Sequence, residues 1–185
     1  MESLDQLLSH YASHGHIQYA GEPVDQLGHA WQTLELAKRG RASPTLQLAA
    51  FFHDIGHLLD EDQVPHERAG SAVLAAVFGP SVACLVSLHV EAKRYLVSKE
   101  PGYVNTLSED SVRSLRRQGG PMTAEEMSLF EKKPGADQAI LLRRWDEEAK
   151  NGEAITPPLP IIRMALLDSI DQLRLMAHHR HNGPQ

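Results

Sequence analysis

The stretch Phe51-Phe52-His53-Asp54-Ile55-Gly56-His57 decides the fold, because it places three potential metal ligands at the end of an apolar, alanine-rich segment. An imidazole and a carboxylate that are adjacent at a helix end can face one pocket and share a divalent or trivalent metal ion. An isolated His-Asp pair also occurs at helix ends that bind no metal. The choice between these two interpretations depends on whether the rest of the chain supplies further ligands.

The composition predicts a helical protein. The chain has 185 residues, which is long enough for one domain with a buried core. Hydrophobic residues make up 42% and charged residues 23%, which is typical of ordinary globular proteins. Leu and Ala are abundant and clusters of β-branched residues are scarce, which favours helix over strand. We therefore expect an all-α fold with a single domain over residues 1–185, a core over about 19–176 and a flexible tail over 177–185.

Charge and cysteine usage restrict the classes of partner. A net charge of -6 without a basic face argues against nucleic acid as the main partner. The single cysteine, Cys84, excludes an internal disulfide and suits a reducing cytoplasm. The first residues lack the features of a signal peptide, and no apolar run approaches the roughly 20 residues that span a bilayer. We expect a cytoplasmic protein with no membrane partner, and the sequence does not indicate its oligomeric state.

Capping residues, glycines and prolines divide the chain into helices. Ser43-Pro44, Ser108 and the capping box at Thr123 indicate helix starts, and Gly40 and Gly56 indicate helix ends. The expected helices cover residues 4–11, 23–39, 44–54, 66–78, 81–89 with a kinked continuation to 97, about 109–118, about 124–132, 137–150 and 161–176. The histidine-rich segment 178–181 is expected to be a frayed, solvated end rather than a metal site.

Further candidate ligands lie on the expected helices or at their ends. They are four histidines and two carboxylates: His29, His53, Asp54, His66, His89 and Asp146. Any one of them alone is more often a surface residue or a satisfied core residue. If they converge in a helical core, they suit one or two first-row transition metals.

The order of these ligands resembles the HD-domain superfamily, a helical metal-binding fold named for its adjacent His-Asp pair. Most of its members are phosphohydrolases in which the metal activates water. The resemblance implies one metal held by His29, His53, Asp54 and Asp146. It implies a second metal held by Asp54, His66 and His89, with one oxygen of Asp54 bound to each ion.

Longer strings narrow the resemblance over residues 19–150. They are Tyr19-Ala20-Gly21-Glu22, the segment from His89 to Val97, Gln118-Gly119-Gly120-Pro121-Met122 and Arg143-Arg144-Trp145-Asp146-Glu147. These strings look like those of the mixed-valent di-iron HD-domain oxygenases. That resemblance implies an Fe(II)/Fe(III) pair, O2 as co-substrate, and cleavage of the C–P bond of a 1-hydroxyphosphonate. The expected substrate is 2-amino-1-hydroxyethylphosphonate or its N-trimethyl analogue, giving glycine or glycine betaine plus phosphate.

Helical spacing places two cations beside the ligands. Lys93 follows His89 by four residues and Arg143 precedes Asp146 by three, so each pair shares one helix face. Either cation alone would more often be a solvated surface group. His57, three residues beyond Asp54, can reach the same pocket. We expect Asp54, His57 and Lys93 to be catalytic, and the resemblance adds Ser111 and Gln118 to the phosphonate-binding residues.

The segment before the helix that carries His29 is suited to the amine end of the substrate. Tyr19 and Glu22 offer an aromatic face and a carboxylate to an ammonium group, and Gln26 belongs to the same segment. Glu22 could equally be a first-turn charge that the helix dipole favours. A choice between a primary and an N-methylated amine does not follow from these residues. Because the loop at 58–65 is short, the sequence does not indicate how the substrate reaches the pocket.

Two other classes of function remain at this point. One is an HD-superfamily metal-dependent phosphohydrolase that uses a metal-bound hydroxide. The other is a metal-stabilised interaction domain without activity, which would leave the candidate phosphonate-binding residues without a task. An inositol-oxygenase type of activity fits less well, because a neutral polyol would not need these cations.

Overall fold

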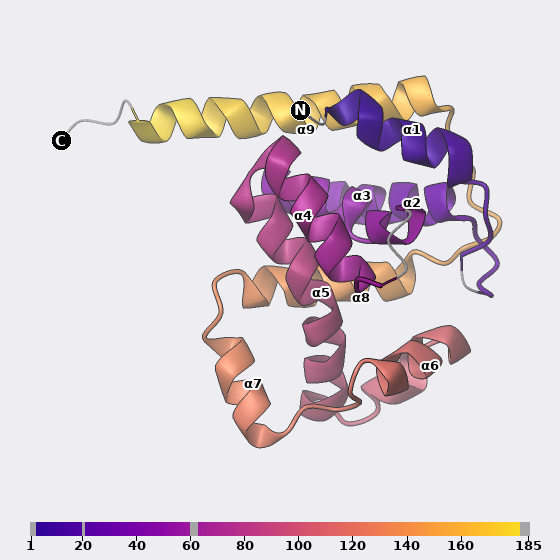
Figure 1. Ribbon diagram of the computed structural model, residues 1–185, viewed down its shortest axis with the longest axis vertical. Helices are drawn as coiled ribbons and strands as arrows, with labels where there is room; N and C mark the ends of the chain where they lie inside the picture. Colours follow the sequence, from indigo (N-terminus) through magenta and orange to yellow (C-terminus); the bar gives the residue numbers. More distant parts are fainter. Residues whose placement is uncertain (1–2, 20, 60–62, 182–185) are drawn as a thin grey trace.

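The computed structural model describes residues 3–19, 21–59 and 63–181, and within these ranges it is helical, as predicted (Figure 1). An isolated antiparallel bridge between Gln18 and Asp25 is the sole strand-like pairing in that part of the chain. The elements in order are α1 (Leu4–His14), α2 (Gln26–Arg39), α3 (Pro44–Phe52), η1 (Ile55–Leu58), α4 (His66–Phe78), α5 (Pro80–Lys99), η2 (Tyr103–Thr106), α6 (Glu109–Arg117), α7 (Ala124–Glu131), α8 (Ala136–Glu148) and α9 (Leu159–His181).

Side-chain caps determine where several helices begin. Ser43 and Ser108 each accept a hydrogen bond from a backbone N–H in the first turn, and Thr123 forms the predicted capping box with Glu126. The predicted start of α2 near Pro23 is wrong. The Asp25 side chain accepts a hydrogen bond from Gly28 N, so α2 begins at Gln26 and the residues before it stay in the loop that carries Tyr19.

Helix α3 lies at the centre of the molecule and positions the His-Asp pair. All its residues except Thr45 are buried, and it packs against α2, α5, α8 and α9. Helix α5 runs from this core to a second apolar cluster, which it forms with η2, α6, α7 and α8 (Figure 1). The predicted continuation after His89 is confirmed and reaches Lys99, since α5 is a single helix from Pro80 to Lys99. His89 and Lys93 therefore stand on one continuous helix.

Gly56 does not end α3, as the sequence had suggested. Helix α3 ends at Phe52, and Gly56 lies within η1, where it is buried. A Cβ atom on Gly56 would lie 2.0 Å from the backbone oxygen of His66. A glycine at this position therefore lets η1 contact the first turn of α4, and that contact brings His66 toward Asp54.

Replacement of Gly56 by alanine should destabilise the protein and move His66 away from the other ligands. The methyl group would overlap backbone atoms that cannot rotate away, so we expect a loss of about 1–3 kcal/mol or more in the free energy of unfolding. Urea unfolding and metal content measure the two effects. Gly70→Ala is a graded control, because its Cβ would lie 3.2 Å from the Ile55 side chain and 3.3 Å from the Gly56 backbone nitrogen, which is tight but needs a shift of only a few tenths of an ångström. Equal losses in both variants would contradict this explanation.

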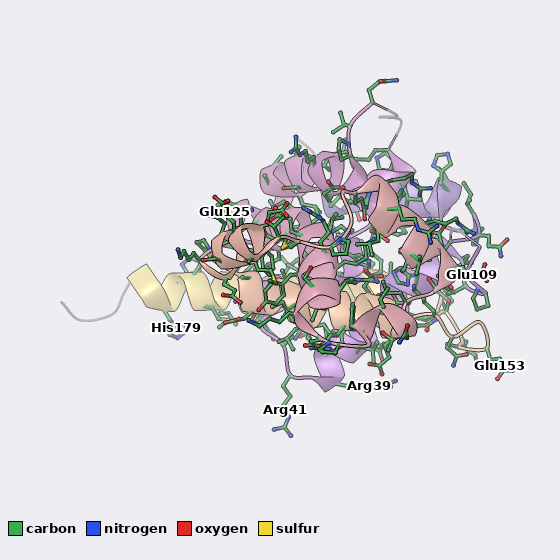
Figure 2. The ribbon with its side chains drawn as sticks, turned by 90° about the horizontal axis from the view of Figure 1, so that it is seen from below. Arg39, Arg41, Glu109, Glu125, Glu153 and His179 are labelled. Carbon is green, nitrogen blue, oxygen red and sulfur yellow. The ribbon has the colours of Figure 1, made fainter. Side chains whose placement is uncertain are left out.

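The C-terminal helix is longer than predicted. Helix α9 continues to His181, beyond the predicted end near Met176, and the flexibility of the tail over residues 177–185 stays a prediction. His179 is exposed and lies on the part of α9 that extends away from the other helices (Figures 1 and 2). Residues 182–185, and residues 60–62 of the short loop, lie outside the described residues. The organisation of residues 1–185 as one domain stays a prediction. None of the described helices has the length and apolar character to cross a membrane.

Candidate metal centre and substrate pocket

Six side chains from five segments of the chain converge on one site. His29 comes from α2, His53 and Asp54 follow α3, and His66, His89 and Asp146 come from α4, α5 and α8. All are buried except His66, which is half-buried. They form two groups whose ligand atoms lie within 4.8 Å of one another, namely His29, His53, Asp54 and Asp146, and Asp54, His66 and His89. The structure thus brings together all six residues that the sequence nominated as ligands.

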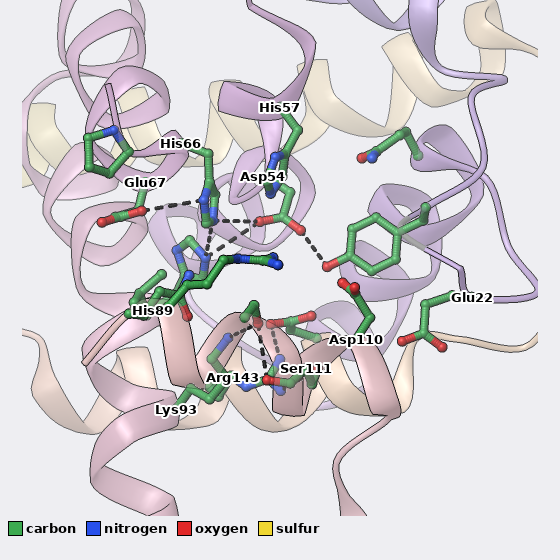
Figure 3. Close-up of a pocket in the computed structure, with 18 residues that line it drawn as sticks. Glu22, Asp54, His57, His66, Glu67, His89, Lys93, Asp110, Ser111 and Arg143 are labelled. Atoms are coloured by element: carbon green, nitrogen blue, oxygen red, sulfur yellow. Dashed lines mark hydrogen bonds and ion pairs between the residues drawn. The ribbon is translucent and has the colours of Figure 1, made fainter. Parts of the chain in front are cut away.

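Asp54 belongs to both groups and offers a different oxygen to each. Its Oδ2 atom lies 3.4 Å from His53 Nε2 and 3.9 Å from His29 Nε2. Its Oδ1 atom lies 3.4 Å from His66 Nε2 and 3.5 Å from His89 Nε2 (Figure 3). Asp54 stands just beyond the end of α3, and this position lets its carboxylate face both groups.

The tautomers of three histidines follow from their backbone partners. Nδ1 of His29 lies 2.8 Å from the carbonyl oxygen of Ala149. His53 and His89 make the same contact with the carbonyls three residues earlier on their own helices, at 2.9 and 2.6 Å. A carbonyl only accepts hydrogen bonds, so in each ring Nδ1 carries a proton, and in the neutral form Nε2 presents a lone pair.

These lone pairs point at one another and at carboxylates. His29 Nε2 and His53 Nε2 are 3.2 Å apart, and His66 Nε2 and His89 Nε2 are 3.1 Å apart. Asp146 Oδ1 is buried without a hydrogen-bond partner among the described residues, 3.3 Å from His29 Nε2. Both groups therefore bring several acceptors within a few ångströms of one another, an arrangement that a bound cation stabilises. Imidazole and carboxylate ligands in this number fit first-row transition metals.

The charges in the site also favour a cation. Burial lowers the pKa of His53, but the carboxylates of Asp54 and Asp146 outweigh it and raise that pKa to about 10. Burial raises the pKa of Asp54, but His53 and the other histidines hold it well below its ordinary value. Asp54 is therefore an anion at any working pH, and positive charge is stabilised between it and the imidazoles.

A cavity of about 510 Å³ opens beside the two groups, and all eight predicted substrate residues line it. These residues are Tyr19, Glu22, Gln26, His57, Lys93, Ser111, Gln118 and Arg143. Figure 3 shows Asp54 and His66 on one side of the pocket and Ser111 and Arg143 on the other. A small ligand in this cavity can therefore contact both the metal-binding groups and the cations.

The two cations are held in place by neighbouring side chains. Lys93 is buried and donates a hydrogen bond to Ser114 Oγ at 2.6 Å. Burial and the nearby Arg143 lower the pKa of Lys93 to about 8. Arg143 is 2% exposed and donates hydrogen bonds to Asp146 and Glu147. Each cation thus has a fixed orientation at the pocket wall.

Three further polar groups line the pocket: one has no hydrogen-bond partner, and two contact the residues of the metal-binding groups. Gln118 Oε1 is buried without a hydrogen-bond partner among the described residues. The ring of His57 is exposed at the pocket and stacks on the ring of His66, with centroids 4.0 Å apart. Tyr19 donates a hydrogen bond to Asp54 Oδ2 at 2.6 Å and stacks on His29. Burial and the Asp54 charge raise the pKa of Tyr19 well above its ordinary value, so the hydroxyl keeps the proton that it donates.

The sequence reasoning missed six charged or polar residues of this site, one of which is Arg117 at the pocket wall. Glu67 lies 3.4 Å from His66 Nδ1, Ser114 supports Lys93, and Glu147 and Lys150 surround Ser111. Asp110 lines the pocket from α6 (Figure 3). Glu147 could have been found from its spacing of four residues after Arg143, and Glu67 from its position next to His66. Asp110 and Ser114 carry no local signal, because long-range packing brings them to the pocket, and the relation of Lys150 to Glu22 likewise depends on that packing.

Residues 27–184 match the HD domain family. The chain is 40% identical over 152 residues to the 1-hydroxy-2-(trimethylamino)ethylphosphonate dioxygenase (glycine-betaine-forming) of Leisingera caerulea, covering 77% of this chain and 78% of that protein. It is 43% identical over 159 residues to the hydroxymethylphosphonate dioxygenase of Gimesia maris, covering 80% and 79%. It is 31% identical over 183 residues to an uncharacterised protein of Acanthamoeba polyphaga mimivirus, covering 93% and 84%. The helical fold, the buried His-Asp groups and these similarities together establish that the chain belongs to the HD-domain family.

Proposed function

We propose that this chain is an O2-dependent oxygenase that cleaves the C–P bond of a 1-hydroxyphosphonate. The observation that carries the proposal is the pairing of two acceptor groups, joined at Asp54, with a pocket wall that presents Lys93 and Arg143. The relatives named as phosphonate dioxygenases, at 40% and 43% identity, support the same activity. The expected substrate carries a 2-ammonium group, as in 2-amino-1-hydroxyethylphosphonate or its N-trimethyl analogue.

The proposed reaction uses O2 as the oxidant and needs no other co-substrate. The hydroxyl-bearing carbon becomes a carboxylate, the C–P bond breaks, and the phosphorus leaves as inorganic phosphate with release of one proton. With an ammonium substrate the organic product is glycine, and with the N-trimethyl substrate it is glycine betaine.

We propose that the two groups hold two iron ions in the Fe(II)/Fe(III) state. His29, His53 and Asp146 would bind one ion, His66 and His89 the other, and Asp54 would contribute one oxygen to each. When bound, the iron pair supplies the activation of O2 and the electron transfer that oxidation of the substrate carbon requires. The asymmetry of the ligand sets supports a difference between the two ions, since one group has two carboxylates and the other has one.

The protein's own side chains would bind and orient the phosphonate. Its negative charge requires cations that remain charged after water is excluded, and Lys93 and Arg143 face the pocket opposite the metal-binding groups. The free Gln118 Oε1 can accept a hydrogen bond from a hydroxyl. His57, beside His66, can contact a phosphonate oxygen that lies near the metals. Together these contacts would hold the hydroxyl-bearing carbon against the metal centre.

The residues at the other end of the pocket would bind the head group. Glu22 is 8% exposed and lines the pocket with Tyr19 and Gln26. The carboxylate and the aromatic ring suit an ammonium group. Tyr19 also covers one side of Asp54, so it limits access of water to that side of the metal centre.

The decisive test measures phosphate release and O2 consumption by protein purified with iron. We expect equal amounts of O2 consumed and phosphate released from a 1-hydroxyphosphonate, and no release without O2. After partial reduction, a coupled Fe(II)/Fe(III) EPR signal should change when substrate is added. Phosphomonoester hydrolysis that is supported by Mn(II) or Mg(II) and independent of O2 would instead identify a phosphohydrolase.

The pH dependence should report Lys93. Because its pKa is lowered to about 8, its positive charge is present below that pH and is lost above it. We expect kcat/KM for a phosphonate to fall above pH 8, approaching about tenfold per pH unit as the protonated fraction falls. A steady-state pH profile measures the fall. In Lys93→Arg the guanidinium stays protonated, so the fall should disappear, and a fall at the same pH in that variant would assign it to another group.

A further inference from the structure

The carboxylate at the head-group end of the pocket already has a cation beside it. Lys150 Nζ lies 3.1 Å from Glu22 Oε1, and both side chains are about nine-tenths buried, at 11% and 10% exposure. The contact lacks hydrogen-bond geometry, and Glu22 Oε1 has no hydrogen-bond partner among the described residues. The charge of Glu22 is thus offset by a cation that lies beside it without a hydrogen bond.

Lys150 approaches Glu22 from behind the pocket wall. Glu22 lines the cavity, whereas Lys150 is not among the described residues that line it. The Lys150 ammonium donates hydrogen bonds to Ser108 Oγ at 3.0 Å, Ser111 Oγ at 3.1 Å and Glu147 Oε1 at 3.0 Å. These contacts fix the ammonium in place, so its charge acts on the head-group end without contact with the substrate.

The other charges nearby do not change this balance. Arg143 pairs with both Asp146 and Glu147, and Glu147 also pairs with Lys150. Asp110 is the second carboxylate of the head-group end, and its partner is Arg113, whose side chain is 54% exposed. The side chain of Asp110 is 24% exposed, whereas that of Glu22 is 10% exposed, so water screens the charge of Asp110 more strongly. The Glu22–Lys150 pair is therefore the part of the head-group charge that water screens least.

We propose that Lys150 is a specificity-determining residue that reduces the preference of the pocket for a cationic head group. By offsetting Glu22, it lets the pocket take 1-hydroxyphosphonates with a small uncharged head group as well as those with an ammonium group. The names of the two relatives specify substrates with different head groups: one carries a trimethylamino group, and the other, hydroxymethylphosphonate, carries no amine. The inference rests on the proposed function and concerns the substrate class of the same site.

The test compares two substrates in Lys150→Met. The measured quantity is kcat/KM for 2-amino-1-hydroxyethylphosphonate divided by kcat/KM for hydroxymethylphosphonate. Without the Lys150 charge, the negative charge of Glu22 is no longer offset and attracts the ammonium group of the substrate more strongly. This ratio should therefore rise about tenfold, equivalent to about 1.4 kcal/mol. A purely structural role, through Ser108 or Ser111, would change both values together and leave the ratio unchanged.

Three further variants complete the test. In the Glu22→Gln background, Lys150→Met should no longer change the ratio, because coupled residues give non-additive effects in a double-mutant cycle. Lys150→Arg should keep the native ratio, since it keeps the charge. Lys133→Met, which removes an exposed lysine that pairs with Glu91 and does not line the pocket, is the matched control and should leave the ratio unchanged.

Each contrary outcome has a distinct meaning. A ratio that stays within about twofold of the native value in Lys150→Met overturns this inference while the proposed function stands. An equal rise in the Glu22→Gln background also overturns it, because Lys150 would then act on another group. If the native protein releases no phosphate from either substrate, the proposed function fails and this inference fails with it.

Discussion

Replacing Asp54 by alanine should remove both metal ions and lower the rate of phosphate release at least about a thousandfold, equivalent to about 4 kcal/mol. The reason is geometric. Each Asp54 oxygen faces a different pair of histidines, at 3.4 to 3.9 Å, so one substitution removes a ligand from both groups. It also removes the anion that balances the charge of a cation in the buried site.

Metal content and EPR measure this effect directly, apart from activity. His29→Ala provides the contrast, because His29 belongs to one group alone, and we expect that variant to keep one ion of the two. Asp168→Ala, which removes an exposed carboxylate on α9, controls for loss of an aspartate as such. Full occupancy of either group in Asp54→Ala would refute the bridging role.

Replacing Arg143 by methionine should destabilise the fold and also abolish tight phosphonate binding. Arg143 is buried and satisfies two carboxylates, Asp146 and Glu147, at once. Burial lowers its pKa, but these carboxylates outweigh that effect and raise the pKa far above its ordinary value, so it is always charged. Loss of one partner leaves uncompensated buried charge, and we expect a decrease of about 3–5 kcal/mol in the free energy of unfolding.

The neighbouring residue gives a matched control for this prediction. Arg144 is the next residue of α8, but its side chain is 42% exposed and pairs with Glu100, which is also exposed. Arg144→Met should therefore change the free energy of unfolding by no more than about 1 kcal/mol. Urea unfolding of both variants measures the difference, and KM for a hydroxyphosphonate should rise in the Arg143 variant alone. Similar stabilities of the two variants would contradict a structural role for the Arg143 network.

The sequence predicted most of the site because its ligands carry strong local signals. In the structure, the adjacent His53 and Asp54 belong to the same ligand group. His89 and Lys93, spaced by four residues, both line the pocket, and so do Arg143 and Asp146, spaced by three. The fold class followed from composition and caps. The site roles themselves stay predictions until the variants are measured.

The sequence could not predict features that depend on contacts between distant segments. Gly56 looked like a helix cap, but its role depends on the backbone of His66, which approaches it from α4. Lys150 follows α8 without any local pattern, and its relation to Glu22 arises only when the loop before α2 packs against that segment.

The backbone partners of the histidines have a consequence for how such a site can change during evolution. Three of the four rings, those of His29, His53 and His89, give their Nδ1 protons to main-chain carbonyls. No substitution of a neighbouring side chain removes a carbonyl, so the electron donation of these rings is insulated from mutation as long as the helices persist. His66 faces the replaceable carboxylate of Glu67 instead. If the site holds the proposed iron pair, natural variation at Glu67 is therefore the simplest genetic route to a change in the redox properties of the ion at His66 and His89 that leaves the other ion unchanged.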